Sequence, residues 1–71
     1  MKETLRTLRE KNKKTLAEVA KVLEISKRTA YAYEQGTRTI SVEKVVALAE
    51  FFGEKVEDVI EASINTRRSD L

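Results

Sequence analysis

The sequence predicts a single all-α domain, compact and built from five short helices. The 71-residue chain has no Pro, and its two Gly stand at positions 36 and 53, so few residues interrupt a helix. Charged residues, Ala, Leu and Val dominate the composition, and apolar residues recur at helical spacing in several windows. Cys and His are absent, so helix packing or self-association must stabilise this small domain without disulfides or the usual zinc ligands.

The first two helices are predicted from apolar spacing and from one capping motif. The first is expected from about Lys2 to Asn12, with Leu5 and Leu8 one turn apart. Thr15 and Glu18 then have the spacing of a capping box, in which each side chain accepts a hydrogen bond from the other residue's backbone N–H. The second helix follows with an apolar face formed by Leu16, Val19, Ala20 and Leu23.

The third helix is expected between Ser26, a favourable N-cap, and Gly36, a favourable C-cap. The intervening AYAY alternates like a strand, but a strand would place both Tyr on one face and leave the two cap signals unused. At about 100° per residue, Tyr31 instead shares an arc with Lys27 and Arg28, whereas Tyr33 lies on the opposite arc. The segment is therefore predicted to be a helix whose two Tyr diverge.

The fourth helix is expected to begin after Ser41 and to end at Gly53. The fifth is expected to be short, roughly from Val56 to Ala62. We therefore place the domain at residues 1–63 and a short C-terminal tail at residues 64–71. The polar composition of this tail is typical of a frayed segment, and the alternative is that the tail forms part of a dimer interface.

The segment TLAEVAKVLEISKRT (15–29), followed by YEQG (33–36), resembles the phage-repressor/Cro-like (XRE) helix-turn-helix DNA-binding family. The resemblance continues to about Ile60. It implies a lambda-repressor-like five-helix fold with a helix-turn-helix formed by helices 2 and 3. It also implies a homodimer that binds operator DNA with the third helix in the major groove.

Four positions depart from the family pattern. Glu24 stands where the family usually has Gly, and a left-handed conformation there costs on the order of 1 kcal/mol relative to Gly. Leu16 replaces a Gln that often contacts phosphate, and Lys14 replaces an apolar residue. Ala30 replaces a branched aliphatic residue, and we expect Tyr33 to fill the space that it leaves.

The charge distribution favours a polyanionic partner for the first half of the chain. The net charge of +2 divides into +5 over residues 1–41 and −3 over residues 42–71. The candidate base contacts are Lys27, Arg28, Tyr31 and Ala32. Without the resemblance, the same side chains describe an ordinary solvated helix face, and that alternative stays open here.

The candidate phosphate contacts flank these residues on both sides. They are Lys13, Lys14, Thr15, Gln35, Thr37, Arg38 and Thr39, for which a polar surface is the alternative. The resemblance further implies a structural ion pair between Arg9 and Glu34.

Self-association is predicted from apolar residues outside the core stripes. The candidate dimer interface contains Phe51, Ile60 and Ile64, against the alternative of a wider core. For Val46 we favour the core.

The sequence argues against several other classes of function. Catalysis is not expected, because His, Cys, a Gly-rich phosphate loop and converging acids are missing. We expect no cofactor, metal or small-molecule ligand, and no membrane partner. The localisation expected from the lack of a long apolar segment is cytoplasmic. The prediction is a DNA-binding transcriptional regulator, most simply a homodimeric repressor of an inverted repeat. The alternatives are a protein-interaction module, such as an antitoxin-like or adaptor domain, and a helical domain without a nucleic-acid role.

Overall fold

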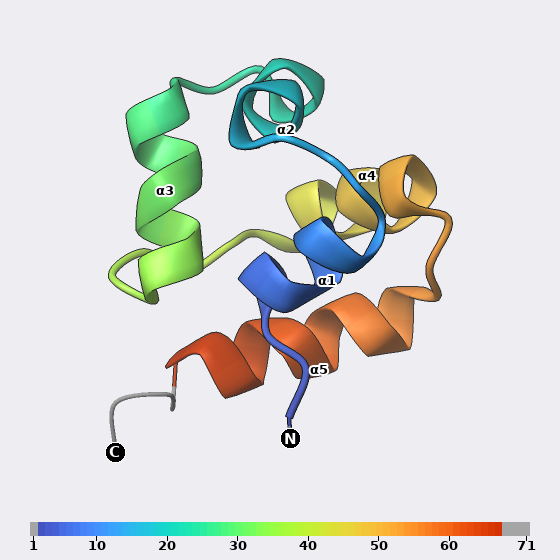
Figure 1. Cartoon of the computed structure of the whole chain (residues 1–71). Helices are drawn as coiled ribbons and strands as arrows, with labels where there is room; N and C mark the ends of the chain where they lie inside the picture. Colours follow the sequence, from blue (N-terminus) through green and yellow to red (C-terminus); the bar gives the residue numbers. More distant parts are fainter. Residues whose placement is uncertain (1, 68–71) are drawn as a thin grey trace.

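A computed structural model describes residues 2–67, and this part of the chain is folded into five α-helices joined by short links (Figure 1). The helices are α1 (Leu5–Lys11), α2 (Leu16–Leu23), α3 (Lys27–Gln35), α4 (Val42–Phe52) and α5 (Val56–Arg67). No helix among these residues is long and apolar enough to cross a membrane.

Hydroxyl side chains determine where four of the helices begin. Thr15, Ser26 and Ser41 each accept a hydrogen bond from the backbone N–H three residues further on, as predicted. Thr4 does the same for α1 and forms a capping box with Thr7. The first helix consequently begins at Leu5 and not at Lys2, because the extended Thr4 backbone serves as the cap.

The fifth helix is longer than predicted and continues to Arg67 instead of ending near Ala62. Thr66 explains the difference, because it is 3% exposed and its hydroxyl is used twice. The hydroxyl donates to the Ala62 carbonyl oxygen at 2.8 Å and accepts from the Leu5 N–H at 2.9 Å. A polar residue in the expected tail is thus a buried link to α1. The remainder of that tail, residues 68–71, lies outside the described residues.

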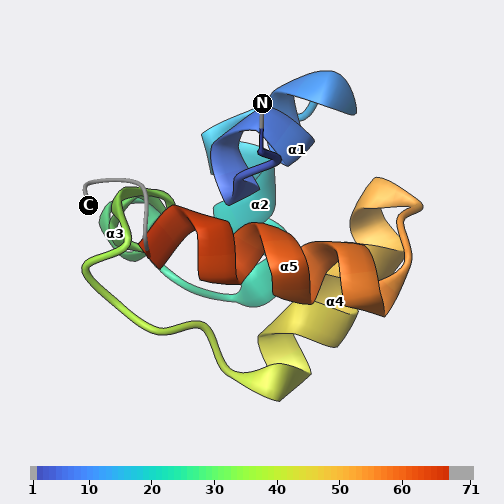
Figure 2. The same cartoon turned by 90° about the horizontal axis from the view of Figure 1, so that it is seen from below.

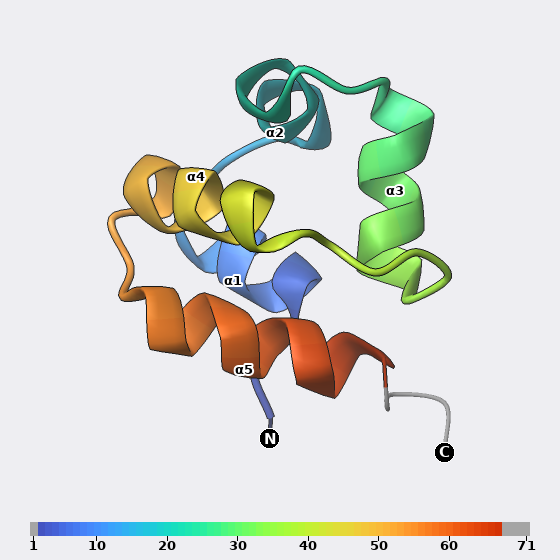
Figure 3. The same cartoon turned by 180° about the vertical axis from the view of Figure 1, so that it is seen from behind.

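The helices are arranged so that α3 forms one edge of the molecule. Helix α2 packs against α3 and α4, and α5 packs against α1 and α4. Seen from below, α5 runs across the molecule between α1 and α4 (Figure 2). From behind, an extended link joins α3 to α4, and α3 lies at the periphery (Figure 3). One side of α3 therefore faces away from the other helices.

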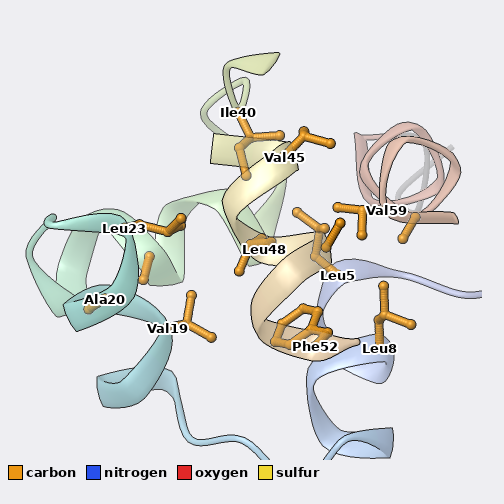
Figure 4. Packing of buried hydrophobic residues seen from close by; sticks show 13 residues of the cluster. Leu5, Leu8, Val19, Ala20, Leu23, Ile40, Val45, Leu48, Phe52 and Val59 are labelled. Carbon is orange, nitrogen blue, oxygen red and sulfur yellow. The ribbon is translucent and has the colours of Figure 1, made fainter. Parts of the chain in front are cut away.

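The core is formed by apolar side chains from all five helices, which converge on one interior (Figure 4). Leu8 and Val59 are the largest side chains that are fully buried. Helix α3 contributes Ala30, which is 1% exposed, and Tyr33 packs against the same cluster. The inward position of Tyr33 agrees with the prediction. Val46 was expected to belong to the core, but it is 42% exposed on α4.

Gly36 and Glu24 both end a helix in the left-handed conformation, but for different reasons. Gly36 (φ 78°) ends α3, and a Cβ at this position would lie 2.9 Å from the Thr66 carbonyl oxygen. Only Gly satisfies both this backbone conformation and this close approach. Glu24 ends α2 with φ 57° and ψ 45°, so this non-Gly residue does adopt the left-handed conformation whose cost was considered above.

Candidate nucleic-acid interface

The outer side of α3 presents the side chains predicted to contact bases. Lys27 and Arg28 are exposed in the first turn, and Tyr31 is 54% exposed one turn later. Ala32 is partly buried beside them. Since Ala30 and Tyr33 occupy the inner side, the sequence and the packing together orient this cationic and aromatic surface outward.

The N-terminal end of α3 is defined by local hydrogen bonds. The Ser26 hydroxyl accepts from the Thr29 N–H at 3.1 Å, and the same hydroxyl donates to Thr29 Oγ1 at 2.9 Å. The preceding turn from Glu24 places α2 and α3 next to each other, with the Ile25 N–H donating to the Ala20 carbonyl oxygen at 2.9 Å. These contacts fix the start of the helix that carries Lys27 and Arg28.

A polar segment begins at Gln35, the last residue of α3, and continues into the link that follows. Gln35, Thr37, Arg38 and Thr39 are all exposed, as a phosphate-contacting segment requires. Thr37 already has an intramolecular role, since its N–H and its hydroxyl donate to the Ala32 carbonyl oxygen at 3.1 and 3.2 Å. The Thr37 hydroxyl oxygen can still accept a hydrogen bond, but its proton is already donated to the Ala32 carbonyl oxygen.

The third group of predicted contacts lies at the N-terminus of α2. Thr15 and Glu18 form the predicted capping box, with the Thr15 N–H donating to Glu18 Oε1 at 2.7 Å. Hydrogen bonds from the backbone and the side chain of Thr15 lower the pKa of the Glu18 carboxyl, and Lys14 adds to this effect. Lys13 is exposed, whereas the Lys14 ammonium lies 4.7 Å from the centroid of the Phe51 ring. The structure thus gives Lys14 a cation–π partner that sequence reasoning did not anticipate.

The expected ion pair between Arg9 and Glu34 connects α1 to α3. Arg9 Nε donates to Glu34 Oε2, and Arg9 Nη2 donates to Glu34 Oε1 at 3.2 Å. A third hydrogen bond runs from Arg9 Nη1 to the Lys14 carbonyl oxygen at 2.9 Å. The side chains are only 15% and 8% exposed, and the hydrogen bond to Glu34 raises the pKa of Arg9 above its usual value. This fork-to-carboxylate pair holds the C-terminal half of α3 against α1.

A cleft between α1 and α3 was missed by sequence reasoning. It measures about 330 Å³, and Arg6 lines it together with Tyr31 and Gln35 from the outer side of α3. The signal available in the sequence was the spacing of Arg6 and Arg9, which places both on neighbouring positions of one helix.

The predicted dimer residues do not form one continuous surface. Ile60 and Ile64, 44% and 47% exposed, line an apolar groove of about 220 Å³ together with Val42, which is 76% exposed. Phe51 lies apart from this groove at the far end of α4, where it packs against Phe52 and under Lys14. The structure brings Ile60 and Ile64 together and adds Val42, which was not among the predicted interface residues.

Comparisons with known proteins support this arrangement. The protein-family model described as Helix-turn-helix matches residues 5–59, which cover all of α1 to α4 and the first turn of α5. No curated protein and no solved structure gave a match. The match and the contact between α2 and α3 establish the lambda-repressor-like all-α fold predicted from the sequence. The chain therefore belongs to the phage-repressor/Cro-like (XRE) helix-turn-helix family of DNA-binding transcription regulators.

Proposed function

We propose that the protein is a homodimeric repressor that reads a short inverted repeat in the major groove of double-stranded DNA. The observation that carries this proposal is the outer side of α3, where Lys27, Arg28 and Tyr31 are exposed together at one edge of a helix-turn-helix domain. In such domains the first turn of the second helix of the motif enters the groove, and that turn contains both cations.

Each of these side chains has a defined partner in this proposal. Arg28 donates two hydrogen bonds to guanine O6 and N7, and Lys27 makes a single point contact. Ala32 touches a thymine methyl group, and Tyr31 contacts a thymine methyl group or donates its hydroxyl to a phosphate. A bidentate pair of this kind contributes about 1–3 kcal/mol of discrimination between bases.

The phosphate contacts are proposed on both flanks of α3. Lys13, Lys14 and Thr15 lie at the N-terminus of α2, where the helix dipole favours an anion. Gln35, Thr37, Arg38 and Thr39 contact the backbone on the other flank. These contacts fix the register of the protein on the duplex but carry no sequence information directly.

A homodimer is supported by the apolar groove beside α5. We propose that Ile60 and Ile64 of two protomers bury this groove in a two-fold interface, whereas Phe51 contributes only if the interface extends to the far end of α4. A dimer of this type places two copies of α3 about 34–36 Å apart, which is one turn of DNA. Sedimentation at high micromolar concentration tests it, and a strict monomer would refute the preformed dimer.

Selection of binding sites from random duplex DNA tests the main proposal. The expected result is a pair of related half-sites in inverted orientation. Arg28→Ala should relax the preference at one base position of each half-site, whereas Arg38→Ala should weaken binding to all duplexes alike. Arg38 is thus the control for charge loss without base readout.

Two outcomes would contradict the proposal. If the protein had no affinity for duplex DNA at low salt, the proposal of DNA binding would be refuted. That result would favour a protein-interaction module that uses the same apolar groove. If Arg28→Ala kept the sequence preference of the wild type, the base contact assigned to Arg28 would be refuted, but the proposal of DNA binding would stand.

A further inference from the structure

Arg6 is an exposed cation next to α3 for which the proposed DNA contacts have no role. Its side chain is 63% exposed on α1. Among the described residues, its polar contact is a hydrogen bond from Nε to Glu10 Oε2 at 3.2 Å. Glu10 is itself 52% exposed, and an exposed pair of this type holds a guanidinium weakly. The two Nη groups of Arg6 are thus available to a ligand outside the domain.

The surroundings of Arg6 form a concave surface. The cleft between α1 and α3 is lined by Arg6, Arg9, Leu16, Tyr31, Glu34 and Gln35. A second hollow adjoins it, and Arg6, Glu34 and Gln35 line both. Arg6 therefore stands where the two hollows meet, on the side of the domain that also exposes Tyr31.

The two arginines of this cleft differ in the donors that they have left. Arg9 is bound to both carboxylate oxygens of Glu34 and to the Lys14 carbonyl oxygen, so its charge is compensated. Leu16, the first residue of α2, contributes no side-chain donor at the cleft. The charged donor that the cleft can offer to an anion is consequently Arg6.

We infer that this cleft binds one phosphate group of the DNA backbone and that Arg6 is its charged donor. The inference rests on the proposed function, because a duplex lying against the outer side of α3 brings its backbone to the cleft past Tyr31 and Gln35. The planar fork of Arg suits a phosphate, to which it donates two parallel hydrogen bonds. On binding, Arg6 exchanges its weak pairing with Glu10 for the phosphate.

The salt dependence of duplex affinity tests this inference. Arg6→Gln removes the charge but preserves helix propensity, and Arg6→Lys preserves the charge but not the fork. The matched control is Lys55→Gln, because Lys55 is exposed in the link between α4 and α5, on the opposite side of the molecule from α3 (Figure 1). All variants are compared with the wild type on one selected duplex and one mixed-sequence duplex.

Loss of one phosphate contact should make the slope of log K against log salt shallower by about 0.9. Between 50 and 200 mM salt, the wild type should therefore lose about 3.5-fold more affinity than Arg6→Gln. Arg6→Lys should keep the wild-type slope with a lower affinity, and Lys55→Gln should keep the slope. Glu10→Gln, which frees Arg6, should tighten binding in the wild-type background but not together with Arg6→Gln.

Four results would overturn the inference. Equal slopes for Arg6→Gln and the wild type would show that Arg6 neutralises no phosphate. A loss confined to the selected duplex would identify a base contact instead. Replacement of chloride by inorganic phosphate at constant ionic strength should affect both proteins equally, and a selective effect on the wild type would identify a site for a free anion. A wild type that binds no duplex would refute the proposed function itself, and the inference with it.

Discussion

The two ends of α3 are held in different ways. At the N-terminal end, the Ser26 cap and the left-handed Glu24 belong to the same short turn, and their hydrogen bonds are local. At the C-terminal end, Glu34 is paired with Arg9 of α1, and Gly36 lies against the Thr66 carbonyl of α5. One end is thus fixed by its neighbours in sequence, and the other by tertiary contacts.

Because of this difference, the residues that hold α3 in place and the cations proposed to contact bases lie at opposite ends of one helix. The tertiary contacts at the C-terminal end hold α3 in place, so substitutions there should lower the free energy of unfolding. In the first turn, the Lys27 and Arg28 side chains are exposed and do not belong to the core cluster. Substitutions of those two side chains should alter binding without unfolding the domain.

The largest expected effect comes from breaking the ion pair at the C-terminal end. Glu34→Ala leaves Arg9 largely buried without its carboxylate, and we expect the free energy of unfolding to fall by about 3 kcal/mol. A domain of this size has only about 4–10 kcal/mol in total. Urea denaturation measures the loss.

Glu34→Gln is the matched control, because it keeps an acceptor for Arg9 while removing the charge. Its loss should be smaller than that of Glu34→Ala. A loss below about 1 kcal/mol for Glu34→Ala would mean that the pair contributes no more than a surface ion pair, and the contrast between the two ends would be broken.

The next effect concerns the close approach of α3 to α5. Gly36→Ala combines a left-handed Ala with a Cβ that meets the Thr66 carbonyl oxygen, and we expect a loss of about 2–3 kcal/mol. Gly53→Ala is the control, since Gly53 has φ 70° but nothing within 4 Å of an added Cβ. It should lose only about 1 kcal/mol by thermal or urea unfolding. Equal losses at the two positions would show that the contact with α5 carries no energy.

The same contrast explains what could be predicted from the sequence. The caps at Thr15, Ser26 and Ser41 are local, so residue type and spacing sufficed to place them. Thr66 could not be recognised, because its burial depends on the N-terminus of α1, at the other end of the chain. A polar residue late in the sequence is typical of a tail unless a distant donor makes it part of the core.

The candidate site divides in a similar way. The outward orientation of Lys27, Arg28 and Tyr31 follows from helical periodicity alone. The partner of Arg9 came from a family resemblance and not from any spacing. The cleft at Arg6 and the position of Lys14 over Phe51 depend on how α1 packs against its neighbours, which no local pattern specifies.

The smallest expected effect on stability concerns Glu24, in the turn at the N-terminal end of α3. Glu24 is exposed and left-handed, so Glu24→Gly should relieve backbone strain, offset in part by the greater entropy of Gly in the unfolded chain. The net gain should be about 0.5–1 kcal/mol, a rise in Tm of roughly 2–8 °C. Lys13→Gly is the matched control, because Lys13, in the link before α2, has a φ of 58°, close to the 57° of Glu24. A gain in stability at both positions, with an unchanged half-site preference for Glu24→Gly, would show that the turn at Glu24 is strained and that this strain is not required to position α3. A loss of stability at Glu24 alone would mean that its side chain supports the turn, and the N-terminal end would then depend on more than its local caps.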